Sequence, residues 1–104
     1  AGLGDIGHHY PDTDPAWKGA DSLAILRDVA AKVTTLGWRI GNVDCSVVCE
    51  SPRIAPSRDT MVTLLSKAAG APVSVKGRRA EGLGAIGRSE GIACFASAVI
   101  IKES

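Results

Sequence analysis

The stretch TLGWRIGNVDCSVVCE, residues 35–50, decides the fold of this chain. In its second half apolar and polar residues alternate, which is the period of a β-strand with one covered face. The apolar positions of that face are Val43, Cys45, Val47 and Cys49. We therefore expect a strand over residues 38–50, ended by the loop SPRIAPS at residues 51–57.

Helical patterns lie on both sides of this strand. Upstream, Asp21 or Ser22 can cap a helix that ends before Gly37. Its apolar positions recur at helical spacing and are Leu26, Val29, Ala30 and Val33. Downstream, Ser57 can cap a second helix that ends before Gly70, with Asp59 in its first turn. The apolar stripe of the second helix is Met61, Leu64, Leu65 and Ala68.

The remaining segments complete an alternating order of helices and strands. Residues 1–20 are rich in Gly, Pro and Asp and predict a turn-rich entry segment. A short strand is expected at Val73–Lys76, a flexible basic loop at 77–91, and a strand covered on both faces at Ile92–Lys102. This order predicts a single domain over residues 1–104, an α/β (α+β) sandwich whose mixed sheet carries its helices on one face.

Composition excludes several classes of protein. The 104 residues are 45% hydrophobic and 22% charged, which is typical of a folded domain. A net charge of +1 and four aromatic residues disfavour nucleic-acid binding. The chain has no apolar run that could span a bilayer, so we expect no membrane partner. Its three cysteines include no CxxC pair, so we expect a reducing compartment and a core-packing role for the cysteines. The charge is split, because residues 1–52 carry seven acidic and four basic side chains and residues 53–104 carry four acidic and eight basic ones.

Two segments are candidates for binding. The run YPDTDP at residues 10–15 holds carboxylates between prolines and could present them to sugar hydroxyls, or it could be an ordinary surface turn. The glycine-rich loop with Arg78, Arg79 and Arg88 could hold a phosphate, or its charges could simply be solvated. The two GxGxxG matches, at residues 2–7 and 82–87, lack the strand before and the helix after that dinucleotide binding requires.

Four motifs together resemble a known family. GDIGHHYPDTDPAWKGADS (4–22), LGWRIGNVD (36–44), GAPVSVK (70–76) and GRSEGIAC (87–94) are similar in order and spacing to the 2-C-methyl-D-erythritol 2,4-cyclodiphosphate synthase family. The resemblance implies a homotrimer with active sites between subunits. It also implies cyclisation of 4-diphosphocytidyl-2-C-methyl-D-erythritol 2-phosphate with release of CMP, in non-mevalonate isoprenoid biosynthesis. Zinc and a second divalent metal, magnesium or manganese, are implied as cofactors, and the location is the bacterial cytoplasm, or a plastid if a transit peptide was removed.

The resemblance also assigns substrate-binding residues, each by its position in a family motif. Those of the diphosphate and metal region and of the threefold axis are Arg78, Arg79, Glu81 and Arg88. Those of the DIG segment and the loop that holds the methylerythritol end are Asp5, Ile6, Gly7, Tyr10, Pro11, Asp12, Thr13 and Asp14. Those of the loop that recognises cytidine are Cys49, Glu50, Ser51, Pro52, Arg53, Ile54 and Ala55.

Departures from the family pattern leave an alternative open. The family's zinc ligands precede the position where this chain begins, so we expect residues 1–104 to be the C-terminal two-thirds of such a domain, with no catalytic or metal-ligating residue of its own. Arg78, Arg79 and Ala80 stand where the family has threonines, and we expect the two arginines to bind the diphosphate in their place. The alternative is an inactive fragment or paralogue that keeps trimer assembly and cytidine nucleotide binding.

Overall fold

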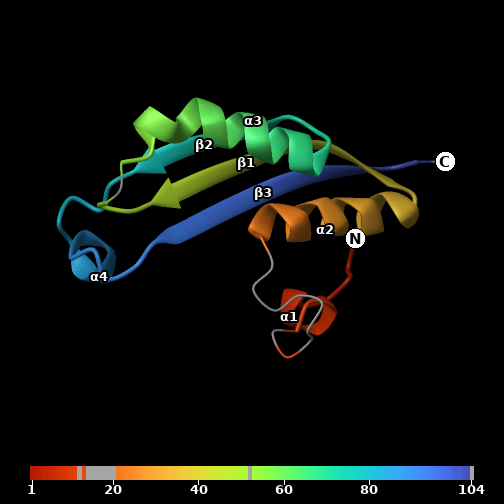
Figure 1. Cartoon of the computed structure of the whole chain (residues 1–104), viewed down its shortest axis with the longest axis horizontal. Coiled ribbons are helices and arrows are strands. Elements are labelled where there is room, and N and C mark those ends of the chain that lie inside the picture. The colour runs from red at the N-terminus through yellow and green to blue at the C-terminus, as the bar shows by residue number, and fades with distance from the viewer. Residues whose placement is uncertain (12, 14–20, 52, 104) are drawn as a thin grey trace.

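The chain folds around a three-stranded mixed sheet, seen in a computed structural model that describes residues 1–11, 13, 21–51 and 53–103 (Figure 1). The strand predicted from the deciding stretch, β1 (Trp38–Val48), is the central one. β2 (Val73–Arg78) pairs with it in parallel, and β3 (Ala93–Lys102) pairs with it antiparallel on the other side. A bulge between Ile40 and Asn42 interrupts the β1–β3 register.

The first long helix, α2 (Ser22–Thr35), begins where its cap predicts. The Asp21 side chain accepts a hydrogen bond from the backbone N–H of Leu23 at 3.2 Å, which satisfies one of the free donors of the first turn. At the other end Gly37 has a φ of +89°, a conformation that suits glycine. The Gly37 carbonyl also accepts a hydrogen bond from the Glu103 N–H at 2.8 Å, so the turn after α2 is joined to the end of β3.

The second long helix, α3 (Arg58–Ala69), follows a 3-10 turn, η1 (Ala55–Ser57). Ser57 occupies the cap position but its side chain makes no capping hydrogen bond, so that part of the prediction is wrong. Leu64 is predicted to belong to the apolar stripe but is 46% exposed, so that part of the prediction is wrong. Gly70 ends the helix with a φ of +70°, as expected for a left-handed C-cap.

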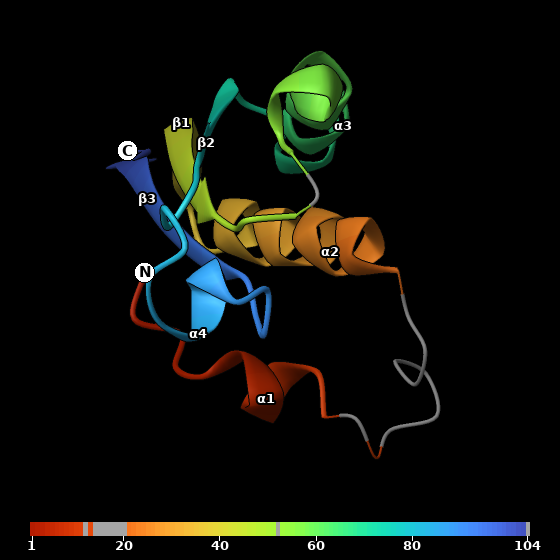
Figure 2. The ribbon, with the colours of Figure 1, turned by 90° about the vertical axis from the view of Figure 1, so that its left-hand side faces the viewer.

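Both long helices cover the same face of the sheet, as predicted (Figure 2). The buried centre lies between α3 and β2 and consists of Ala69, Val73 and Val75. Apolar side chains of the deciding stretch pack against it, as their alternation predicts, and these are Val43, Cys45 and Val47. No helix of the described residues covers the opposite face of the sheet, the open face (Figure 2).

Several expectations for the connecting segments are wrong. The entry segment contains a four-residue helix, α1 (Ile6–His9), and the predicted loop 77–91 contains another, α4 (Gly84–Gly87). β2 continues two residues beyond Lys76 because its backbone keeps pairing with β1 as far as Arg78.

β3 departs most from its prediction. Its residues are apolar, yet none of them is buried, and Phe95 and Val99 on the open face are 68% and 56% exposed. Cys94 is exposed too, so a core-packing role is wrong for this cysteine, whereas Cys49 is buried. None of the helices in the described part of the chain is long and apolar enough to cross a membrane.

Candidate functional site

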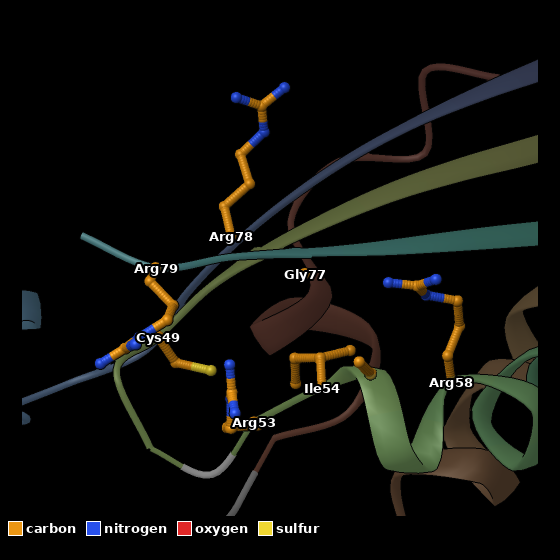
Figure 3. A pocket seen from close by; sticks show the side chains of 8 residues that line it. Cys49, Arg53, Ile54, Arg58, Gly77, Arg78 and Arg79 are labelled. Carbon is orange, nitrogen blue, oxygen red and sulfur yellow. The ribbon is translucent and has the colours of Figure 1, made fainter. Parts of the chain in front are cut away.

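A pocket of about 180 Å³ lies where β1 and β2 end, beside the start of α3 (Figure 3). Its walls come from the loop after β1, the first turn of α3 and the end of β2. The lining residues are Cys49, Arg53, Ile54, Ala55, Arg58, Gly77, Arg78 and Arg79. Six of these are among the site residues predicted from the sequence, and the structure brings them together; Arg58 and Gly77 line the pocket without having been predicted.

Arg58 carries a positive charge at the first residue of α3. A cation there opposes the helix dipole, whose positive end lies at the N-terminus. That unfavourable placement is a signal in the sequence that could have marked Arg58 as a candidate site residue. Neither Arg58 nor Arg53 has an ion pair within the described part of the chain. The pocket therefore carries two guanidinium groups that an anion can bind.

Gly77 lets the loop after β1 approach β2 closely. A Cβ atom at this position would lie 2.5 Å from Cβ of Ile54, well inside contact distance. Because glycine has no side chain, Ile54 packs directly on the strand and forms one wall of the pocket. A glycine inside a strand is often the mark of such a close approach, and this is the signal by which Gly77 could have been found.

Arg78 and Arg79 do not act together in this structure. The Arg78 side chain points away from Arg53, Ile54 and Arg58, because successive residues of a strand face opposite sides (Figure 3). The Arg79 guanidinium is held by the Glu50 carboxylate, with Nη2 donating to Oε2 at 3.0 Å. The expected joint grip of both arginines on one diphosphate is therefore not preformed.

Glu50 lies under Arg79, with a side chain that is only 9% exposed. Its Oε1 accepts a hydrogen bond from the Gly82 N–H at 3.2 Å. This backbone hydrogen bond, followed by the interaction with Arg79, holds the pKa of Glu50 below its usual value. The carboxylate is therefore charged at neutral pH.

The N-terminal group of predicted site residues lies on and around α1. Asp5 precedes this helix and Ile6 and Gly7 are within it, all three exposed. Tyr10 is buried, and its hydroxyl donates to Oδ2 of Asp28 on α2 at 2.5 Å. Burial and this hydrogen bond raise the pKa of Tyr10 to about 12. The pair fixes the start of the YPDTDP segment to α2.

The other predicted residues are distributed around these two groups. Thr13 and Ser51 are exposed and Pro11 is half-buried. Glu81 is exposed, and Arg88 pairs with Glu90 through two contacts of 3.1 Å. Three residues lie outside the described part of the chain, and these are Asp12, Asp14 and Pro52.

The structure does not bring the two groups together. α1 lies beyond α2, on the side away from the pocket, in two views at right angles (Figures 1 and 2). The pocket and the cavity beside α1 share no lining residue.

The described residues do not fit a metal centre by themselves. Within 1–11, 13, 21–51 and 53–103, no three side chains of His, Cys, Asp or Glu cluster in a way that could hold an ion. His9 contacts the Leu3 carbonyl at 2.7 Å and Nζ of Lys32 at 3.3 Å instead.

Comparisons with known proteins agree on one family. The sequence model of the YgbB family matches residues 1–101. The 2-C-methyl-D-erythritol 2,4-cyclodiphosphate synthase of Bordetella petrii is 48% identical over 107 residues, which cover 100% of this chain and 66% of that protein. The bifunctional enzyme IspD/IspF of Anaeromyxobacter dehalogenans is 49% identical over 98% of this chain and 27% of its own length.

Solved structures show the same fold. The CDP complex of IspF from Plasmodium falciparum superposes with a TM-score of 0.80 at 30% identity, over 96% of this chain and 61% of that one. The chain thus spans about two-thirds of the single-function synthases and about a quarter of the bifunctional enzymes that it matches.

Proposed function

The chain belongs to the YgbB family, and from this we propose that it forms the nucleotide-binding part of a 2-C-methyl-D-erythritol 2,4-cyclodiphosphate synthase. The reaction is an intramolecular phosphoryl transfer. An oxygen of the 2-phosphate forms a bond to the β-phosphorus of the CDP group, and the bond from that phosphorus to the oxygen bridging to the α-phosphate breaks. The products are the cyclic diphosphate and CMP, in isoprenoid biosynthesis.

The observation that carries this proposal is the pocket at the ends of β1 and β2. Two of its cations, Arg53 and Arg58, have no ion pair with any described residue and suit an anionic ligand, because guanidinium groups bind phosphate oxygens through charge-assisted hydrogen bonds. A homologous structure with 96% coverage of this chain binds CDP. We assign the pocket to the cytidine diphosphate moiety, bordered by Cys49, Ile54 and Ala55.

Phosphoryl transfer needs positioning and charge stabilisation more than covalent chemistry by the protein. Arg53 and Arg58 would hold the diphosphate and balance the negative charge that moves onto the leaving CMP. A divalent metal bound by ligands beyond those described here would supply further charge neutralisation. Asp5 and the YPDTDP segment would accept hydrogen bonds from the hydroxyls of the methylerythritol end.

The separation of the two groups of site residues supports a homotrimer with active sites between subunits. The α1 region of one copy would complete the pocket of its neighbour. β3 supports the same assembly, because none of its apolar side chains is buried by the described part of the chain. Apolar surface of this kind is typical of a surface that another subunit covers.

Calorimetric titration with CDP tests the pocket assignment. Because each guanidinium supplies a charge-assisted contact, we expect Arg53→Ala and Arg58→Ala each to weaken binding about tenfold. Arg27→Ala is the matched control, since Arg27 is an exposed arginine of α2 outside the pocket. Equal losses of affinity in all three variants would mean that CDP binding depends only on the net charge of the chain, which would contradict the pocket assignment. Absence of CDP binding to the unaltered chain would refute the proposal.

A further inference from the structure

Glu50 joins two segments that form walls of the pocket. Its Oε2 accepts hydrogen bonds from Nη2 of Arg79 at 3.0 Å and from Nε at 3.3 Å. Its other oxygen accepts from the Gly82 N–H at 3.2 Å. The residue before it, Cys49, is buried in the pocket wall, and its N–H donates to the Arg78 carbonyl at 3.0 Å. One carboxylate therefore connects the end of β1 with the turn that follows β2.

The turn held in this way has an unfavourable backbone conformation. Glu81 has a φ of +54°, in the left-handed region that residues with a Cβ rarely adopt, and Gly82 follows with +74°. Across the turn, the Leu83 N–H donates a backbone hydrogen bond to the Ala80 carbonyl at 3.0 Å. Such a conformation persists where surrounding contacts fix it, and the Glu50 carboxylate provides two of them.

The ion pair with Glu50 also limits the availability of the Arg79 guanidinium for a phosphate. Arg79 lines the pocket, but both donors that it directs to Glu50 are occupied and its charge is balanced. A phosphate that used this guanidinium would have to compete with a carboxylate whose side chain is 9% exposed. Arg53 and Arg58 face no such competition within the described residues.

Given the function proposed above, on which this step rests, we propose that Glu50 and Arg79 are positioning residues of the cytidine diphosphate pocket. They fix the turn at residues 79–83 against the end of β1. Arg79 contributes to nucleotide binding through the position of that turn and not by contact with a phosphate.

The variant Glu50→Gln distinguishes a positioning role of Arg79 from direct phosphate binding, because the two roles predict opposite changes in CDP affinity. If Arg79 acts through the turn, loss of the charged acceptor weakens CDP binding, by about tenfold. If Arg79 instead binds phosphate directly, removing the competing negative charge frees its guanidinium and CDP binds more tightly. Arg79→Met is expected to match Glu50→Gln, and the double variant to be no weaker than either, because both substitutions remove one contact.

Hydrogen exchange at the Gly82 amide supplies a readout that does not depend on the nucleotide. Because this N–H donates to Glu50, we expect its exchange in Glu50→Gln and in Arg79→Met to be about tenfold faster than in the unaltered chain. Glu103→Gln is the matched control, since Glu103 is the partner of another Arg–Glu pair, with Arg39, at the far end of the sheet. It should change neither the exchange nor the affinity.

The outcomes distinguish this proposal from the proposed function. Tighter CDP binding in Glu50→Gln, or unchanged exchange at Gly82 in a chain that binds CDP, overturns the positioning role and leaves the function intact. If the unaltered chain does not bind CDP, the proposed function fails and the nucleotide role of the turn fails with it. Faster Gly82 exchange with weaker CDP binding supports both.

Discussion

β2 and β3 flank the same central strand but have opposite environments. β2 has six residues, and its inward positions Val73 and Val75 are 5% and 6% exposed beneath α3. β3 has ten residues, is richer in apolar side chains, and has no buried residue. The difference teaches that an apolar sequence predicts that a strand is covered, but not that its own chain covers it.

The side chains on the open face also differ between its β2 side and its β3 side. On the β2 side it is polar, with Ser74 and Lys76 contacting Asp44 of β1. On the β3 side it presents Phe95 and Val99, and no helix covers it. The buried centre of the chain lies on the helix-covered face, whereas the apolar side chains of β3 are left exposed.

The largest effect is expected for Val75→Ala, which removes two buried carbon atoms beneath α3. The lost burial and the resulting cavity should lower the free energy of unfolding by about 2 kcal/mol. Denaturant unfolding at low protein concentration measures it. Val99→Ala is the same substitution at a residue that is 56% exposed on β3, and it should cost less than about 0.5 kcal/mol. Equal costs would contradict the contrast between the two strands.

A smaller effect, on assembly, is expected for Phe95→Ser. Covering this largely exposed ring in a subunit contact contributes about 1.5 kcal/mol, so its loss should weaken self-association about tenfold. Sedimentation velocity over a range of concentrations measures the change. Leu64→Ser alters an exposed apolar residue of α3 and should leave self-association as it is. The reverse result would place the subunit contact on α3.

The smallest effect is expected for Arg39→Ala at the end of β1 beside β3. Nε of Arg39 donates to Oε1 of Glu103 at 3.0 Å, but both side chains are more than half exposed. Exposed pairs of this kind contribute little, so we expect a loss below about 0.5 kcal/mol in unfolding experiments at low salt. A loss above about 1 kcal/mol would show that β3 is attached by charge as well as by its backbone ladder.

Local sequence patterns predicted those structural features that depend on neighbouring residues of the chain. The alternation of Val43, Cys45 and Val47, the Asp21 cap and the left-handed Gly70 all correspond to observed features. The burial of β3 could not be predicted in this way, because its apolar composition is the same whether a helix or another copy covers it. α4 was missed because four residues rich in glycine carry no helical period.

The motif positions predicted which residues come together in the candidate pocket better than they predicted how the side chains are arranged. Cys49 and Arg53 both line the pocket, but the motifs grouped Arg78 with Arg79. Their side chains diverge because they are adjacent in an extended segment, and because Glu50, 29 residues away in sequence, binds Arg79. A contact between such distant residues has no signature in either local sequence.

The contact between Gly77 and Ile54 limits how this pocket can change during evolution. With only 2.5 Å available to a Cβ at position 77, a larger residue there requires a smaller side chain at position 54 or a displaced loop. The two positions are therefore coupled in one direction: a side chain can be added at position 77 without moving the loop only if the side chain at position 54 becomes smaller.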